Sequence, residues 1–381
     1  MRIAMLLHSG VGGSGVVATE LGLRLAARGH EVHLIANAVP FRLADERHDN
    51  VFFHQIGSMT YPLFDAPLTT LAEASKVVEV VEQYGIDVIH AHYAIPHAAA
   101  ALIARAMVRT RPIPAIVTTL HGTDVTLVGL DAAYLRATQW SIESSDAVSA
   151  VSRYLADTTI NDMGVRRDTI HVVYNAVDTM RFRPGNDPSL RSRYASDSEH
   201  LLVHVSNFRP VKRIEDVIRM FALVHAELPA RLLMIGDGPD RPRAVAVAES
   251  LDVLDRVRFL GSFPRIERLL ACADLFVLPS SKESFGLSAL EAMASGVPVI
   301  ASNIGGLSEV IEHGVSGFLH DVGDTAAMAS SALELLHDRH RMAAFRHAAR
   351  HRAMHVFDPT ANVGAYLDLY ERALGHVRPD G

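Results

Sequence analysis

Short apolar runs alternate with longer segments of helical periodicity, and this alternation constrains the fold more than any other feature of the chain. In the first half, the runs at residues 2–8, 31–36, 87–91, 115–120 and 147–151 predict strands. Several are apolar almost without interruption, as strands covered on both faces of a parallel sheet are. The segments between them, such as 16–27 and 71–83, repeat apolar residues at helical spacing. The pattern predicts βαβ units in a doubly wound sheet.

The alternation stops once and then starts again, which predicts two domains. The break is a cluster of turn residues at 183–188. Strands are predicted after it at residues 201–206, 231–235, 257–260, 275–279, 297–301 and 317–319. A chain of 381 residues is long enough for two domains. We predict two facing doubly wound, Rossmann-like α/β domains, residues 1–178 and 179–357, with a cleft between them and a last helix, 358–381, packed back on the first.

Composition narrows the class of protein. Hydrophobic residues make up 49% of the chain, and no apolar run reaches the roughly 18 residues that a membrane-spanning helix needs. The net charge is −7 and the basic residues are scattered, which argues against a nucleic-acid partner. The only cysteine is Cys272, so an internal disulfide is excluded and a reducing cytoplasm is the simplest location. The sequence predicts a soluble cytoplasmic enzyme and leaves its oligomeric state open.

A glycine-rich loop follows the first predicted strand. Gly10, Gly12 and Gly15 match the G-x-G-x-x-G pattern of dinucleotide-binding loops. Such a site needs a carboxylate at the end of the second strand, and residues 35–39 contain none. No Gly-Lys-Ser/Thr follows, so the Walker pattern fails as well. Two interpretations stay open: a turn that lets strand and helix pack closely, or bare helix amides that bind an anion or a polar ligand.

Histidines gather at the ends of two further predicted strands, at residues 90, 92 and 97 and at His121. Their spacing matches no known zinc pattern, and with 21 histidines in the chain some fall close together by chance. We therefore expect no metal. His121 precedes Gly122 at a strand end, where a neutral imidazole can donate to a ligand hydroxyl. A packed structural histidine is the alternative.

Two basic residues, Arg209 and Lys212, follow the first predicted strand of the second half. A planar guanidinium and a compact ammonium together suit the oxygens of a phosphate. A solvated basic turn is the alternative.

Two carboxylates flank the start of a later predicted helix. This helix is expected to begin near Phe285, so that the amides of residues 285–287 lie at its positive end. Glu283 lies just before that end, and Glu291 lies about two turns further along. Carboxylates so placed can bind hydroxyls of a sugar and of a ribose while the amides bind phosphates between them. They fit general acid and base roles in hydrolysis less well, and an ordinary solvated helix face is the alternative.

These residues resemble those of the retaining GT-B glycosyltransferases, a nucleotide-sugar family that includes sucrose-phosphate synthases and mannosyltransferases. Glu283 and Glu291 with Phe285-Gly286-Leu287 between them look like the donor motif of that family, and residues 296–299, 305–306 and 309 follow as the family has them. The resemblance is closer to one branch, the N-acetyl-α-D-glucosaminyl L-malate synthases of bacillithiol biosynthesis. It is carried by residues 11–15, 40–43, 90–97, 118–124, 142–146 and 204–209.

The resemblance implies a GT-B fold and a reaction in which N-acetylglucosamine moves from UDP-GlcNAc to the hydroxyl of L-malate, giving GlcNAc-α-L-malate and UDP. It implies no metal, because side chains and helix amides would take the diphosphate charge. Arg209 and Lys212 would hold the diphosphate and stabilise the leaving UDP. Glu283 and His121 would contact the donor sugar, and Glu291 the ribose. The family also implies front-face displacement, in which the leaving phosphate oxygen takes the acceptor's proton.

Further residues match the family at positions that surround these groups. On the donor side they are Gly12, Gly13, Asn207, Gly238, Ser284, Phe285, Gly286 and Leu287. On the malate side they are Ser14, Tyr93, Thr119 and Arg42. The cation that pairs with the malate carboxylates is not assigned.

Three rival functions remain. The first is a related glycosyltransferase with a lipid or polysaccharide acceptor. A lipid acceptor predicts a basic amphipathic face in the first domain, but residues 71–83 carry three glutamates and one lysine. A UDP-sugar epimerase-hydrolase would release free sugar without malate. A nucleotide-sugar sensor would show a decayed donor motif, and here the motif is whole.

Overall fold

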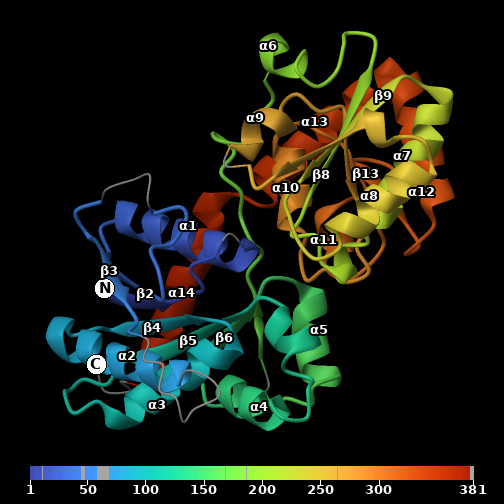
Figure 1. Ribbon diagram of the computed structural model, residues 1–381. Coiled ribbons are helices and arrows are strands. Elements are labelled where there is room, and N and C mark those ends of the chain that lie inside the picture. The colour runs from blue at the N-terminus through green and yellow to red at the C-terminus, as the bar shows by residue number, and fades with distance from the viewer. Residues whose placement is uncertain are drawn as a thin grey trace. The chain divides into compact units, whose positions relative to one another are not determined.

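The chain forms two compact units (Figure 1). The computed structural model describes residues 1–10, 12–43, 48–57, 68–167, 169–185, 187–263 and 265–377. The first unit is Met1–Asn175 together with the chain from Thr360 onward, and the second is Ala176–Pro359. The boundaries predicted from the sequence, after residues 178 and 357, lie close to these.

A parallel sheet of seven strands forms the centre of the first unit, in the order β3-β2-β1-β4-β5-β6-β7. Ile3 of β1 pairs with Val32 of β2 on one side and with Val88 of β4 on the other, so β1 lies inside the sheet. The strands are β1 (Arg2–Leu6), β2 (Glu31–Ala36), β3 (Val51–Gln55), β4 (Val88–His92), β5 (Ala115–Leu120), β6 (Ala147–Ala150) and β7 (His171–Val172).

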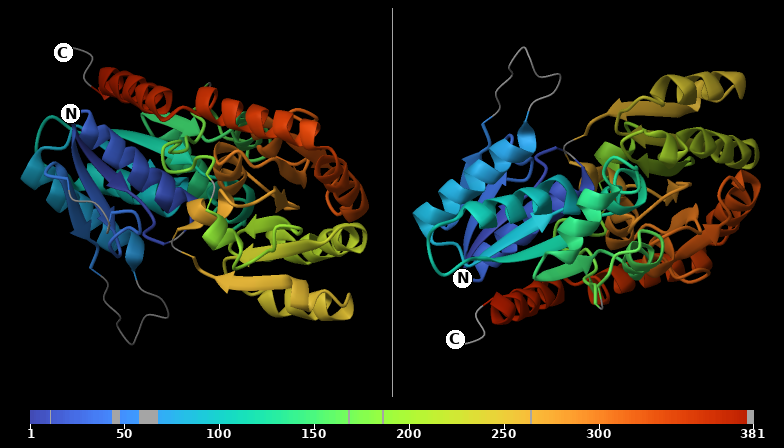
Figure 2. Two further views of the ribbon diagram at one scale, coloured as in Figure 1. Left: turned by 90° about the horizontal axis from the view of Figure 1, so that it is seen from above. Right: turned by 90° about the horizontal axis from the view of Figure 1, so that it is seen from below.

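Successive side chains of a strand point to opposite faces, so these apolar strands present apolar side chains on both faces of the sheet. Helices cover both faces. Ile3 and Met5 lie in one core with α1 and α14, while Ala4 and Leu6 lie in the other with α2 and α3. The last helix, α14, packs on this unit, as Figure 2 shows in red. The helices are α1 (Gly13–Ala27), α2 (Thr69–Tyr84), α3 (Ala99–Met107), α4 (Leu135–Glu143), α5 (Arg153–Asn161) and α14 (Pro359–Val377), with short π-helical segments η1 (Ala94–Ala98) and η2 (Thr123–Leu127).

The second unit repeats this plan with a parallel sheet of six strands, in the order β10-β9-β8-β11-β12-β13. Its strands are β8 (His200–Val205), β9 (Ala230–Ile235), β10 (Val257–Gly261), β11 (Leu275–Leu278), β12 (Val299–Ser302) and β13 (Gly317–His320). Its helices are α6 (Pro188–Arg191), α7 (Ile214–Glu227), α8 (Arg241–Ser250), α9 (Ile266–Leu270), α10 (Leu287–Ala294), α11 (Leu307–Val310), α12 (Thr325–His337) and α13 (Arg339–His355), with 3₁₀ turns η3 (Pro210–Lys212) and η4 (Leu254–Arg256). The prediction of two doubly wound parallel sheets is confirmed.

Two strands were missed by the sequence analysis, β3 and β7, and both lie at an edge of the first sheet. β3 is only partly buried along its length, and β7 has two residues. An edge strand is covered less than a central one, so it lacks the continuous apolar run on which the other predictions relied.

In each sheet the strand order reverses beside the first strand of that sheet. This switch point determines where the candidate site is expected. β1 lies between β2 and β4, and β8 lies between β9 and β11. In open α/β sheets, ligands bind outside the carboxyl ends of the strands at such a switch point. A ligand is therefore expected at the loops after β1, β4, β8 and β11.

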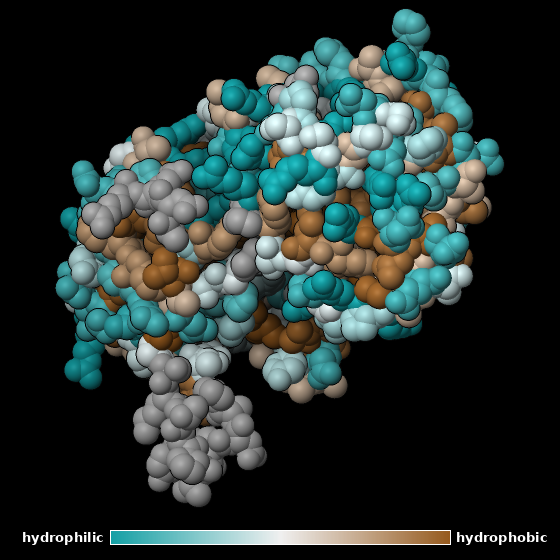
Figure 3. Space-filling view, turned by 45° about the horizontal axis from the view of Figure 1, so that its top comes forward, coloured by the Kyte–Doolittle hydropathy of each residue, from teal (hydrophilic) through white to brown (hydrophobic). Residues whose placement is uncertain are grey.

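Across the described ranges, no helix has both the length and the apolar character needed to cross a membrane. The face drawn in Figure 3 carries hydrophilic residues interspersed with hydrophobic patches.

Candidate active site

The glycine loop of the first unit joins β1 to α1 and combines close packing with free helix amides. A Cβ at Gly15 would meet the carbonyl oxygen of His8 at 2.3 Å and that of Gly10 at 2.9 Å, so only glycine fits there. Gly12 is the N-cap of α1 and has open space around it, and Gly12 and Gly13 are exposed. Gly15 thus serves close packing, whereas Gly12 and Gly13 at the start of α1 are exposed, as the second interpretation requires.

Tyr93 follows β4 and reaches the start of α1. Its hydroxyl donates to Ser14 Oγ over 2.7 Å, and its N–H donates to the carbonyl of Thr119 over 2.9 Å. Its φ of 101° is rare for a residue other than glycine. Strained backbone of this kind is concentrated at functional sites. The structure therefore brings two of the expected acceptor-side residues, Tyr93 and Ser14, into contact.

His121 lies just after β5 and is held as a neutral imidazole. Its Nε2 lies 3.0 Å from Nδ1 of His92, which is fully buried. Burial lowers the pKa of His121 to about 3, and burial lowers the pKa of His92 well below its ordinary value. Both rings are therefore uncharged at neutral pH, which is the state in which His121 could donate to a ligand hydroxyl.

Asp124, a residue whose role the sequence analysis missed, fixes the backbone beside His121. Its Oδ1 accepts from the N–H of Gly122 over 2.9 Å, and its Oδ2 accepts from the N–H of Ala94 over 2.9 Å. It thereby ties the loop after β5 to the loop after β4. Burial raises the pKa of Asp124, and these N–H donors oppose that rise. An aspartate two residues after a strand-end glycine was the available signal.

The other two acceptor-side candidates have internal partners. The Thr119 hydroxyl is fully buried and lies 2.7 Å from His90 Nε2 and 2.7 Å from Ser149 Oγ. Among the described residues, Arg42 is paired with Glu20 of α1 at 3.6 Å and lies over the ring of Phe41. Neither side chain belongs to the contact between Tyr93 and Ser14.

In the second unit, the loops after β8 and β11 bring a predicted cation and a predicted carboxylate together. Lys212 Nζ and Glu283 Oε1 form a short ion pair. Ser280 Oγ donates to the same carboxylate oxygen over 3.2 Å, and the N–H of Ser281 donates to the carbonyl of Val211 over 2.8 Å. The loop after β8 is thus fastened to the loop after β11 by side chains and by backbone.

Arg209 and Asn207 lie in the same loop after β8, and both are exposed. Gly238, after β9, packs against this loop so closely that a Cβ there would meet the carbonyl oxygen of Asn207 at 2.1 Å. The Arg209 side chain is therefore exposed, while the backbone of its loop is packed against Gly238.

Helix α10 begins at Leu287, so the prediction of a start near Phe285 was wrong by two residues. Gly286 precedes the helix with φ 96° and ψ 51°, a left-handed conformation that interrupts helical backbone. A Cβ at Gly286 would also meet Leu307 Cδ2 at 2.4 Å. The first amides of α10 are those of residues 287–289, with no acidic residue in the first turn to compete for them. Ser284 is partly exposed, whereas Phe285 is buried.

Glu291 lies in the middle of α10 and is 7% exposed. It lies more than one turn C-terminal to the first amides of the helix, and Glu283 precedes these amides in the sequence. The carboxylate–amide–carboxylate order predicted from the sequence is therefore retained with the later helix start.

Comparison with known proteins identifies the family. Residues 11–181 match the family described as Glycosyltransferase Family 4, and residues 187–352 match Glycosyl transferases group 1. N-acetyl-alpha-D-glucosaminyl L-malate synthase from Bacillus anthracis is 42% identical over 371 residues, covering 97% of this chain and 96% of that protein. This chain belongs to the GT-B glycosyltransferases. The predicted family and the prediction of an enzyme are confirmed.

Other glycosyltransferases share the sequence or the fold. D-inositol 3-phosphate glycosyltransferase from Thermobispora bispora is 30% identical over 401 residues, covering 96% of this chain and 91% of that protein. Sucrose-phosphate synthase from Thermosynechococcus elongatus superposes with a TM-score of 0.81 at 22% identity, over 99% of this chain and 100% of that one. Anabaena Alr3699/HepE in complex with UDP and glucose superposes with a TM-score of 0.82 at 23% identity, over 97% and 98%.

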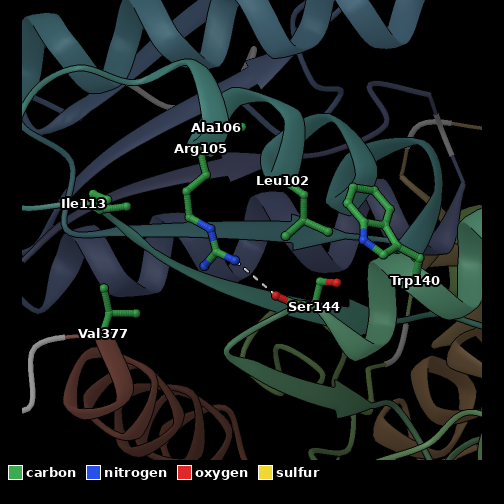
Figure 4. Close-up of a pocket in the computed structure, with 7 residues that line it drawn as sticks. All are labelled: Leu102, Arg105, Ala106, Ile113, Trp140, Ser144 and Val377. Atoms are coloured by element: carbon green, nitrogen blue, oxygen red, sulfur yellow. Dashed lines mark hydrogen bonds between the residues drawn. The ribbon is translucent and has the colours of Figure 1, made fainter.

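A cavity of about 520 Å³ in the first unit lies away from the candidate loops of that unit (Figure 4). Its lining includes Ile113, which precedes β5, and Trp140 of α4. Arg105 donates to the carbonyl of Ser144 over 3.2 Å at its edge. Because Ile113 lies at the amino end of a parallel strand, the cavity is at the opposite end of this sheet from the loops after β1, β4 and β5. Within the described part of the chain, no three or more His, Cys, Asp or Glu side chains gather as a metal site would need.

Proposed function

We propose that this glycosyltransferase transfers N-acetylglucosamine from UDP-GlcNAc to the hydroxyl of L-malate, forming GlcNAc-α-L-malate and UDP in the first step of bacillithiol biosynthesis. The observation that carries the proposal is the 42% identity, over nearly the full length of both chains, to an enzyme named for that product. A cytoplasmic location and a reaction without a bound metal are part of the same proposal.

In the proposed donor site, three groups share the negative charge of the diphosphate: Arg209, Lys212 and the first amides of α10. Lys212 has three N–H donors, so it can keep its bond to Glu283 and still donate to a phosphate oxygen. Glu283 in turn has a second carboxylate oxygen for a hydroxyl of the sugar. Glu291 would accept from the ribose.

The proposed reaction is a front-face displacement. The malate hydroxyl oxygen bonds to C1 of the sugar as the bond from C1 to the phosphate oxygen breaks, and that phosphate oxygen takes the hydroxyl proton. Charge then develops on UDP, where Arg209, Lys212 and the helix amides stabilise it. Neutral His121 would donate to the sugar and hold it for attack, while Ser14 and Tyr93 would meet the acceptor.

The first experiment measures UDP release by the purified enzyme from UDP-GlcNAc, with L-malate, D-malate and other hydroxy acids each supplied in turn. We expect release that depends on L-malate and a product that proton NMR shows to be α-linked. A β-linked product, or no dependence on malate, would refute the proposal.

A second acceptor belongs in the same experiment because of a specific observation, the 30% identity to a D-inositol 3-phosphate glycosyltransferase. Turnover with D-inositol 3-phosphate but not with L-malate would assign the enzyme to that acceptor class. Release of free sugar without any acceptor would instead indicate a hydrolase.

A further inference from the structure

A buried glutamate and a buried histidine form an ion pair beside the loop after β4. Glu73 lies on α2 and His97 lies on η1. Nδ1 of His97 lies 2.5 Å from Oε1 of Glu73. Among the described residues, Glu73 has no other ion-pair partner. Because a buried carboxylate is costly unless a cation or hydrogen-bond donors compensate it, His97 is the group that compensates Glu73.

The pair leaves one N–H of His97 without a partner. An imidazole is a stronger base than a carboxylate, so the proton in the contact belongs to His97, which is then an imidazolium with an N–H on each ring nitrogen. Nδ1–H donates to Glu73. Among the described residues Nε2 makes no hydrogen bond, yet it is not one of the unpartnered side-chain nitrogens that are closed off from solvent. The exposed 9% of the His97 side chain therefore includes Nε2.

The topology of the first unit brings this pair to the edge of the sheet where the candidate loops lie. α2 connects two parallel strands, β3 and β4, so its first turns lie at the carboxyl edge. The ring centre of His97 lies 6.3 Å from that of Tyr93, whose hydroxyl donates to Ser14. His121 is also near, since the charge of His97 is the cause, after burial, that lowers the pKa of His121. His97 thus lies among the residues expected at the acceptor and the donor sugar.

We propose that His97, held as a cation by Glu73, binds a carboxylate of L-malate through its Nε2–H. This gives the acceptor the cation that the sequence analysis left unassigned. A hydrogen bond between an imidazolium and a carboxylate is charge-assisted and therefore among the stronger ones. Glu73 fixes the orientation of the ring and keeps it charged. The inference rests on the proposed function, because malate is its ligand.

The first test replaces His97 by glutamine, which can still donate a hydrogen bond but carries no charge. His97→Gln should raise KM for L-malate about 10- to 100-fold, the effect of losing one hydrogen bond between charged groups. KM for UDP-GlcNAc should stay within about 2-fold of wild type. His33→Gln is the matched control, since His33 is buried in the same sheet with Nε2 2.9 Å from Oε1 of Glu31, at the amino end of β2. The control should leave KM for malate within about 2-fold.

The second test alters the acceptor as well as the enzyme. Each carboxylate of L-malate is replaced in turn by a carboxamide, and kcat/KM is measured for both monoamides. In the wild type, the monoamide that lacks the carboxylate bound by His97 should react about 10- to 100-fold more slowly than malate. In His97→Gln the cost of that same replacement should shrink to about 3-fold or less, because the charge that recognised the carboxylate is gone.

A double variant guards against a loss of folding. His97→Gln leaves the charge of Glu73 buried without a cation, which destabilises the fold. Glu73→Gln with His97→Gln removes both charges and lets two amides share a hydrogen bond, so it should melt closer to wild type than the single variant and show the same rise in KM for malate.

Three results would overturn the inference: wild-type KM for malate in the folded variants, an equal rise in His33→Gln, or an undiminished cost for both monoamides. The pair would then only fasten η1 to α2. If the wild type shows malate-dependent turnover, these results overturn the inference alone. A wild type without malate-dependent turnover overturns the proposed function and the inference together.

Discussion

At the scale of single residues, the ion pair between Lys212 and Glu283 is the contact on which most of the proposed donor chemistry depends. Its two members come from loops after different strands, and both are partly buried. Partial burial strengthens the interaction of each with a bound phosphate or hydroxyl, since less water screens it. Replacing either member tests the donor site directly.

Lys212→Ala should lower kcat about 10²- to 10³-fold, because it removes a charge that stabilises the leaving UDP. Lys282→Ala is a matched control, since Lys282 is exposed and lies next to Glu283 in the sequence. The control should keep kcat within about 2-fold of wild type, as surface substitutions usually have small effects. Steady-state assays at saturating malate measure both, with thermal melting to verify folding. Wild-type kcat in Lys212→Ala would remove Lys212 from the donor site.

Glu283→Gln should also lose most turnover, by about 10-fold or more, although it keeps the shape of the side chain. The neutral amide cannot balance the charge of Lys212, and it accepts a sugar hydroxyl less strongly than a carboxylate does. The double variant with Lys212→Ala should be much less impaired than the product of the two single effects, because the two residues act as a unit. Strictly multiplicative effects in this cycle would show that the two side chains act independently.

At the scale of elements, the start of α10 is determined by one glycine. Gly286 has a positive φ, and a Cβ there would meet the buried side chain of Leu307. Both features act where the helix amides are expected to meet the donor diphosphate. The strain of a substitution at this position should therefore change binding as well as stability.

Gly286→Ala should reduce the free energy of unfolding by about 2 to 5 kcal/mol, the sum of left-handed strain and overpacking. Gly314→Ala is the matched control, because Gly314 has φ 76° but nothing within 4 Å of a Cβ. It should lose only the strain component, about 1 to 2 kcal/mol. Urea unfolding measures both, and KM for UDP-GlcNAc should rise in Gly286→Ala alone. An equal loss of stability in the two variants would mean that the Leu307 side chain moves aside without a cost in free energy.

Sequence and structure agree best where an element's signal is local. The central strands are runs of apolar residues. Gly15 and Glu283 belong to short motifs that directly follow a predicted strand. Prediction failed at β3, because a half-exposed strand lacks a continuous apolar run. It also failed at the start of α10, because the left-handed backbone of Gly286 delays the helix to Leu287. It missed the hydrogen bond between Tyr370 and His90 as well, because the sequence shows both residues only as members of buried faces.

At the scale of the whole molecule, several neutral buried histidines make stability depend on pH. Burial lowers the pKa of His90 to about 3 and that of His204 to about 4, against 6.5 when exposed. The unfolded chain therefore binds more protons than the folded one below pH 6.5. The stability that these groups contribute is complete above that pH and is lost as the pH falls toward the folded values.

The free energy of unfolding should fall between pH 7 and pH 5, by about 2 kcal/mol from His204 alone. His204→Gln should show a smaller pH dependence than wild type by about that amount, even if it is less stable at pH 7. Urea unfolding at several pH values measures the slope. A wild-type stability that rises as the pH falls over this range would contradict the lowered pKa values.

The sequence by itself determined the two doubly wound sheets, the family and the order of chemical groups along each loop. It could do so because strand burial, helical spacing and the donor motif are properties of short segments. Only the tertiary structure decided which groups meet: Lys212 with Glu283, Tyr93 with Ser14, and Tyr370 with His90. The first two pairs follow from strand order, which brings the carboxyl ends of neighbouring strands to one edge of each sheet. The third follows from the packing of α14 on the first sheet.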